Sequence, residues 1–210
     1  MTRARRHGLA SLLLAGALGA AAATADPLTD ASRRDGWVSY SVALAGREAP
    51  CCYESWRRGQ AVKRTCRLDG REHDGMYGTM SGTIGGRRAT PPVTQLHVFL
   101  RFEDGAVRRL LAVGGDCPVE AGDAAVRALD DVTPAASAAL LLELAQATRG
   151  DLADEALQAL VLHDQVGTET LLALVRDPQR PPAMRRQALF WLGQSEDPRA
   201  LAEIESILNR

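Results

Sequence analysis

The sequence lacks the short motifs that bring catalytic groups together. It has no Gly-x-Ser-x-Gly elbow, because the serine between Gly78 and Gly82 stands one position out of place. The glycine-rich residues 70–86 carry no lysine, which argues against a phosphate-binding loop. No Cys-x-x-Cys-His occurs, which excludes a c-type haem. We therefore expect no catalytic residue, no cofactor and no bound metal.

Histidine is also scarce. Beyond residue 25 only His73, His97 and His163 are present as imidazole acids, bases or metal ligands. His97 lies opposite Leu96 and Val98 in an alternating segment, so we expect its ring to be exposed or partly covered. His163 follows a predicted helix, and its ring is expected to interact with the carbonyl end of that helix.

Residues 1–25 have the three parts of a secretory signal peptide. Three arginines at residues 3–6 precede an apolar run centred on residues 12–14, and small residues precede a cleavage point after Ala25. A membrane anchor is the alternative, but the run is rich in alanine and glycine and shorter than the roughly 20 residues of a spanning helix. We expect a cleaved leader and a periplasmic or secreted chain with no membrane insertion.

An excess of positive charge is missing as well. Cleavage after Ala25 removes three of the 25 basic residues and none of the 26 acidic residues, so the net charge changes from −1 to −4. Nucleic acid attracts basic surfaces, so we do not expect it as a partner.

All four cysteines, Cys51, Cys52, Cys66 and Cys117, lie in the first half of the chain. An even number of cysteines in a small exported domain predicts two disulfides. Neighbouring cysteines rarely bond to each other, so Cys51 and Cys52 are expected to reach Cys66 and Cys117, and both such pairings remain open. Metal ligation by three of these cysteines and His73 is the alternative, but the Cys-x-x-Cys pairs of structural zinc sites are absent.

Alternating apolar residues predict a β-rich domain in residues 26–132. Residues 37–44 and 96–102 alternate between apolar and polar positions, and residues 107–113 form a returning strand. Asp104-Gly105 stands between the last two runs and is typical of a hairpin, because primed turns need positive φ. A short strand is also expected near residues 76–79.

Tyr53, Trp56, Arg57 and Arg58 are the candidate partner-binding residues. They lie in a segment that we interpret as a loop, and aromatic and arginine side chains are enriched at binding surfaces. Packing against the disulfides is the alternative for the two aromatic side chains.

Residues 133–210 have helical periodicity. Thr133-Pro134 is a typical helix start, and Gly150 ends the first helix. Asp151 is the expected cap of the second helix. Further helices are predicted at residues 152–163, 168–176 and 182–193 and from residue 197 onward, and the last is expected to bury Leu201, Ile204 and Leu208.

The helical half contains an internal repeat. Residues 155–160 align with residues 187–192, with Ala156 matching Ala188 and Leu160 matching Leu192, 32 positions later. Paired helices at such a period are typical of an α-solenoid, in which each pair buries its apolar side against the next.

Residues 183–200, AMRRQALFWLGQSEDPRA, resemble a HEAT repeat of the short type found in phycobilisome-lyase-like proteins. Residues 36–42, the Cys51-Cys52 pair and residues 116–122 and 132–137 resemble exported bacterial HEAT-repeat proteins of unassigned activity. The likeness covers most of the chain after the leader. It implies an α+β chain in which a small disulfide-linked antiparallel β-rich domain (26–132) precedes a short HEAT-like α-solenoid (133–210). Some HEAT-fold enzymes bind iron through His-Glu steps, which this sequence lacks.

The resemblance implies a scaffold or protein-binding surface. The expected function is a non-catalytic protein-protein interaction module of the bacterial cell envelope, and no residue selects a more specific regulatory role. The alternative is a thiol-redox or lyase-like enzyme that uses Cys51 or Cys52, which requires an accessible thiolate. With fewer than three full repeats, the helices are expected to need the β-rich domain as a cover for their open apolar end.

Overall fold

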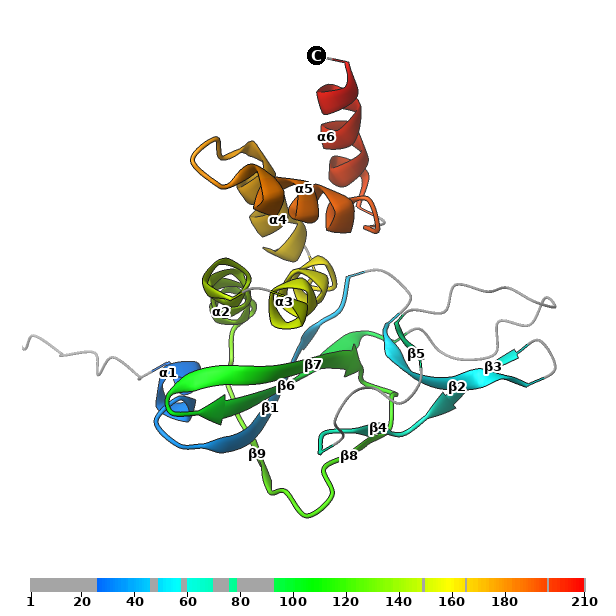
Figure 1. Ribbon diagram of the computed structural model, residues 1–210, viewed down its shortest axis with the longest axis vertical. Helices are drawn as coiled ribbons and strands as arrows, with labels where there is room; N and C mark the ends of the chain where they lie inside the picture. The colour runs from blue at the N-terminus through cyan, green and yellow to red at the C-terminus, as the bar shows by residue number, and fades with distance from the viewer. Residues whose placement is uncertain are drawn as a thin grey trace, which may run out of the picture.

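The computed structural model describes residues 26–45, 49–57, 60–69, 76–78, 93–148, 150–164, 166–195 and 197–209. The expected leader and most of the glycine-rich stretch lie outside these residues. The described chain is mixed α+β, with a region of β-sheet followed by five helices (Figure 1). Among its helices none is both long enough and apolar enough to cross a membrane.

The strands are β1 (Gly36–Ala43), β2 (Cys51–Arg57), β3 (Gln60–Arg64), β4 (Cys66–Arg67), β5 (Met76–Gly78), β6 (Gln95–Glu103), β7 (Ala106–Gly114), β8 (Val119–Glu120) and β9 (Val126–Ala128). The helices are α1 (Pro27–Ala31), α2 (Pro134–Ala147), α3 (Asp151–Val161), α4 (Val166–Arg176), α5 (Pro182–Leu192) and α6 (Pro198–Leu208).

A four-stranded sheet in the order β7-β6-β1-β9 forms the base on which the helices pack. β6 is antiparallel to both β1 and β7, while β9 runs parallel to β1. Asp104 and Gly105 join β6 to β7 with φ values of 52° and 75°, the positive values that a primed turn needs. The predicted strands and hairpin are confirmed, whereas β9 is too short for alternation to reveal.

The two faces of this sheet belong to different cores. On β7, Leu110 and Ala112 pack in the core shared with the helices, whereas Leu111 and Val113 pack in the core that contains all four cysteines. Figure 1 shows α2 and α3 lying along one face of the sheet. Successive side chains of a strand point to opposite faces. One face of the sheet therefore packs against the helices, and the other face packs against the disulfides.

The end of β1 is hydrogen-bonded to the turn between α3 and α4. The amide of Ala45 donates to the carbonyl of Leu162 over 2.8 Å, and the amide of Asp164 donates to the carbonyl of Ala43 over 3.1 Å. Gly167 allows α4 to start close to this turn, because a Cβ there would overlap the carbonyl oxygen of Leu160. These backbone hydrogen bonds therefore join the sheet to the helical half in addition to the covalent connection at residue 133.

The segment around Cys51 and Cys52 is a strand, so its interpretation as a loop is wrong. β2 pairs with β3 on one side and with β5 on the other. A second small pair is formed by β4 and β8, which run parallel. These short strands were not predicted because their sequences alternate too little. Their pairing near the cysteines depends on tertiary structure.

Four helices follow α2 in the chain, α3, α4, α5 and α6, and each has 11 residues. The matched residues Ala156, Leu160, Ala188 and Leu192 are all fully buried. The prediction that Asp151 caps α3 is wrong, because Gly150 occupies the cap position and Asp151 is the first helical residue.

Side chains cap the starts of α2 and α6, and the cap at Thr133 was predicted. The side chain of Thr133 accepts a hydrogen bond from the amide of Ala136 over 3.1 Å, and Asp197 accepts one from the amide of Arg199 over 2.9 Å. Proline follows each cap at the first helical position, where no amide hydrogen bond is lost.

The prediction that α6 buries Leu201 and Leu208 is wrong. These side chains are 59% and 79% exposed, and Ile204 between them is only partly buried. The pattern of α6 is amphipathic, but in the described chain its apolar residues are not all covered. Figure 1 shows α6 at the end of the helical half that is far from the sheet.

We predict that residues 133–210 alone are less stable than the chain from residue 26 to residue 210. Without the sheet, the buried faces of α2 and α3, including Ala138, Leu141 and Leu160, become exposed. The fragment should melt at a lower temperature, with less cooperativity and with increased binding of a hydrophobic dye. Equal melting temperature and cooperativity, followed by circular dichroism, would contradict the shared core.

Candidate functional site

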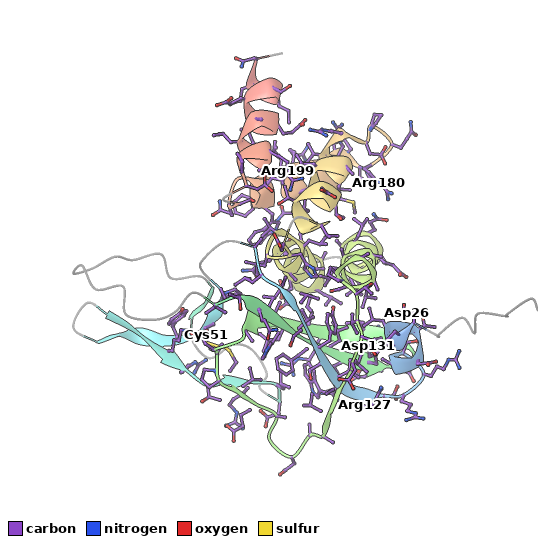
Figure 2. The ribbon with its side chains drawn as sticks, turned by 180° about the vertical axis from the view of Figure 1, so that it is seen from behind. Asp26, Cys51, Arg127, Asp131, Arg180 and Arg199 are labelled. Carbon is purple, nitrogen blue, oxygen red and sulfur yellow. A yellow bond between two sulfur atoms is a disulfide. The ribbon has the colours of Figure 1, made fainter. Side chains whose placement is uncertain are left out.

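A groove between α4 and α6 is the first candidate site. We call it the α4–α6 groove, with a volume of about 540 Å³ and lined by Glu169, Leu172, Ala173, Arg176, Arg199, Ala202, Glu203 and Ser206. Its lining residues recur three or four positions apart on each helix, so one face of α4 and one face of α6 form its walls. Figure 2 shows Arg199 near the far end of the molecule from the sheet.

Two ion pairs cross the α4–α6 groove. Arg176 donates from Nε to Oε2 of Glu203 over 2.7 Å, and Glu203 is only 7% exposed. Arg199 donates from Nη1 to Oε1 of Glu169 over 3.1 Å. Glu203 stands 32 positions after Leu171, which is fully buried, so a carboxylate replaces an apolar side chain at the matched place on α6.

Arg199 is held in its charged form in the α4–α6 groove. Hydrogen bonds to Asp197 and Glu169 raise the pKa of the Arg199 guanidinium above its usual value. Arg199 in turn lowers the pKa of the Asp197 carboxyl. The groove therefore carries a positive charge at Arg199, which suits the binding of a polar surface.

A buried polar chain at the contact between sheet and helices is the second candidate site. The Tyr40 hydroxyl of β1 lies 2.7 Å from Oγ of Ser137 on α2, and Oγ of Ser137 lies 3.2 Å from Nε2 of His163. All three side chains are buried. Nδ1 of His163 is buried and has no hydrogen-bond partner among the described residues.

Burial keeps the ionisable members of this chain neutral. Desolvation lowers the pKa of His163 to about 4 and raises the pKa of Tyr40 to about 12. The hydrogen bond from Tyr40 to Ser137 is therefore made between neutral hydroxyls, whichever of the two donates. The expected interaction of the His163 ring with a helix carbonyl end is wrong, because the ring hydrogen-bonds Ser137 instead.

The contact between Ser137 and His163 is not an accessible nucleophile-base pair. A hydroxyl beside an imidazole is the arrangement that activates a serine nucleophile. Here both residues are fully buried, and no described carboxylate hydrogen-bonds Nδ1 to orient the ring. The chain of three residues therefore joins β1, α2 and the turn after α3 in a structural role. Sequence alone gave no signal for it, since the three residues are far apart.

The four cysteines form two disulfides on the face of the sheet opposite the helices. Cys51 is bonded to Cys117 at 2.03 Å and Cys52 to Cys66 at 2.05 Å, which is one of the two pairings left open by the sequence. The bridges touch each other, with Sγ of Cys66 3.7 Å from Sγ of Cys117. Figure 2 shows Cys51 among the strands, away from the helices that lead to Arg199.

The disulfides occupy the sulfur atoms that metal or redox chemistry would use. The Sγ atoms of Cys51, Cys66 and Cys117 lie within 4.8 Å of one another, a spacing that the two adjacent bridges explain. All four cysteines are buried, and no free cysteine occurs in the described chain. His73, the remaining member of the metal alternative, lies outside the described residues.

Of the candidate partner-binding residues near the cysteines, Tyr53 is the one whose side chain the structure describes. Tyr53 is only 7% exposed and packs in the core with the disulfides, which is the alternative that the sequence left open for it. The backbone of Trp56 and Arg57 belongs to β2, and Arg58 lies outside the described residues. The consecutive residues Cys51, Cys52 and Tyr53 are all buried, so their burial follows from packing around the two bridges and not from alternation along the strand.

Glu155 is a perturbed group that sequence reasoning missed. It lies on α3, and burial together with the charge of Asp151 raises its pKa to about 7, while Arg109 acts in the opposite direction. A carboxyl with this pKa is a candidate acid or base when it lines a cleft. Glu155 does not line the α4–α6 groove, so we assign it no chemical role.

Comparison of the chain with protein-family models, with curated proteins and with solved structures finds no match in any of the three. The site must therefore be argued from its own geometry.

We predict that His163 makes the chain less stable in mild acid. Its pKa is about 6.5 unfolded and about 4 folded, so the unfolded state binds the proton first as the pH falls. This stabilisation is complete above about pH 6.5 and falls by about 3 kcal/mol toward pH 4. His163→Gln, which does not titrate, should lose less unfolding free energy between pH 7 and pH 4. Urea unfolding at both pH values measures this, and identical losses would contradict it.

We also predict that no cysteine reacts in the native protein. Maleimide should label none of Cys51, Cys52, Cys66 and Cys117 before reduction, and labelling after reductant should be slow until urea exposes the bridges. Mass spectrometry after proteolysis should find the two bridged peptide pairs. One cysteine that labels rapidly in native, unreduced protein would support the thiol-redox alternative instead.

Proposed function

We propose that this chain is a non-catalytic protein-binding module of the bacterial cell envelope, built on short HEAT-like repeats. The four consecutive 11-residue helices support this proposal, as do the matched buried residues of α3 and α5. Repeat proteins of this kind stack helix pairs so that equivalent helices line one extended surface. In the proposed solenoid, α4 and α6 are the equivalent second helices.

The α4–α6 groove is the observation that carries the proposal. It lies between the two equivalent helices and exposes paired charges beside small side chains at Ala173 and Ala202. Such a surface offers ion-pair partners and room for another protein. A partner that inserts charged side chains would gain specificity through charge complementarity.

The thiol-redox or lyase-like alternative has less support. It requires a thiolate at Cys51 or Cys52, and both are bridged and buried in the described chain. A location in the periplasm or outside the cell remains part of the proposal, and it agrees with the two disulfides, which persist in oxidising compartments.

We predict that a large side chain in the α4–α6 groove weakens partner binding. Ala173 is exposed and lines the groove, so Ala173→Arg should fill part of it and add an unpaired charge. The chain from residue 26 would be immobilised and used to capture proteins from envelope extract. Recovery of a saturable partner should fall roughly tenfold, the effect of losing about 1.4 kcal/mol of binding free energy.

Ala147→Arg is the matched control, because Ala147 is an exposed residue at the end of α2 and does not line the groove. It should keep full recovery of the same partner, and both variants should melt at the temperature of the unmodified chain. Equal capture by the two variants would place the binding surface elsewhere and contradict the role of the groove.

A further inference from the structure

The large apolar side chains that remain exposed gather in the last helix pair. In the described part of the chain these are Phe190 on α5 and Leu201 and Leu208 on α6, which are 56%, 59% and 79% exposed. Leu201, Ile204 and Leu208 recur at helical spacing, so they share one face of α6. We call Leu201, Ile204, Glu205 and Leu208 the α6 stripe.

The packing of α6 against α4 is the template for a helix that packs against the α6 stripe. The four α4 residues that line the α4–α6 groove are Glu169, Leu172, Ala173 and Arg176. The residues 32 positions later are the members of the α6 stripe. On α4 these four positions face α6. On α6 the four matched positions are the α6 stripe, which no described helix faces in the same way.

The template also defines which positions of a docked helix meet the stripe. On α6, the residues that line the groove opposite α4 are Arg199, Ala202, Glu203 and Ser206. Their spacing is i, i+3, i+4 and i+7, which is one face of a helix. Positions i and i+4 form the ion pairs with Glu169 and Arg176.

The chemistry of the stripe differs from that of its template in a way that identifies the partner. Leu201 and Leu208 replace the charged residues Glu169 and Arg176, so the facing positions i and i+4 must be apolar. Glu205 replaces Ala173, which lies along α4 between the partners of i and i+4, so a basic side chain at position i+3 gains an ion-pair partner.

We infer that the α6 stripe is the docking site for an amphipathic helix of a partner protein, which packs on α6 as α6 packs on α4. The helix carries apolar residues at i and i+4 and a basic residue at i+3. It continues the succession of helices at its uncovered end. This inference rests on the proposed repeat architecture but uses a different surface from the α4–α6 groove.

Charge disfavours a second copy of this chain as the occupant. The uncovered apolar face that a second copy offers on α6 is the same stripe, so pairing the two stripes brings Glu205 of each copy into the same contact. Like charges placed opposite each other weaken such a contact. The patch is also one helix wide, which fits a single helix better than a broad globular face.

A designed peptide tests the inference. The probe has the sequence of residues 197–209 with Arg199→Leu, Ala202→Lys and Glu203→Leu, and a hydrocarbon cross-link between positions 201 and 205. The cross-link holds the helix, since isolated helices of this length are marginal in water. Fluorescence anisotropy of the labelled probe with the chain from residue 26 should give saturable binding. A cross-linked peptide that keeps Arg199, Ala202 and Glu203 should bind at least tenfold more weakly, by roughly the effect of burying one leucine.

Variants of the chain locate the binding. Leu208→Glu and, separately, Leu201→Glu should each weaken binding roughly tenfold or more, and both change exposed residues, so the fold should persist. Phe190→Glu is the matched control, because it removes an exposed apolar side chain outside the stripe and should bind normally. Glu205→Lys should weaken binding of the lysine probe, and a probe with glutamate at position 202 should restore it.

Three results would overturn the inference: no binding of the probe, equal binding by Leu208→Glu, or equal weakening by Phe190→Glu. A dimer in sedimentation experiments that Leu208→Glu dissociates would also overturn it by assigning the stripe to a second copy. Ala173→Arg should leave probe binding unchanged, so failure of the groove and failure of the stripe are distinguishable.

Discussion

The contact between β1 and the turn after α3 is the constraint on which the rest of the structure depends. Two backbone hydrogen bonds join residues 43–45 to residues 162–164, and the Tyr40-Ser137-His163 chain satisfies polar groups directly beside them. Buried polar groups are costly unless they are paired, so this network tolerates one register of β1 against the helices. The positions of α2 and α3 over the sheet follow from that register, and the later helices stack on them.

The disulfides act on the other face of the same sheet, where regular structure is sparse. β4 and β8 form only a two-stranded parallel pair of two residues each, and β2 pairs with short strands. Few ladder hydrogen bonds are available there, so covalent bonds supply what regular pairing does not. Two closed loops would each stabilise such a region by roughly 2 to 4 kcal/mol, mainly by restricting the unfolded chain. The cysteines are thus explained by the weakness of the strands around them.

Local patterns in the sequence predicted the elements that depend on neighbours in the chain. The alternation in β1 and β6, the Asp104-Gly105 turn and the Thr133 cap all act within a few residues. Tyr53 is buried in the same core as Cys117, which is more than 50 residues away in the sequence. His163 hydrogen-bonds Ser137, which is more than 20 residues away. Patterns within a few residues cannot predict such contacts. The α4–α6 groove was expected only as a surface of the helical half, because the facing of two helices is a tertiary property.

The exposed leucines of α6 show why amphipathicity predicts a buried face without saying what buries it. Periodicity identified Leu201, Ile204 and Leu208 as one apolar face, and the same rule correctly identified the buried Ala188 and Leu192 of α5. The difference lies in position: α3 and α5 have helices beside them, whereas nothing in the described chain covers all of α6. Apolar side chains remain at this place although α4 has Glu169 and Arg176 at the matched positions. Exposed apolar patches of this kind mark contact surfaces, so the leucines themselves argue for a covered face.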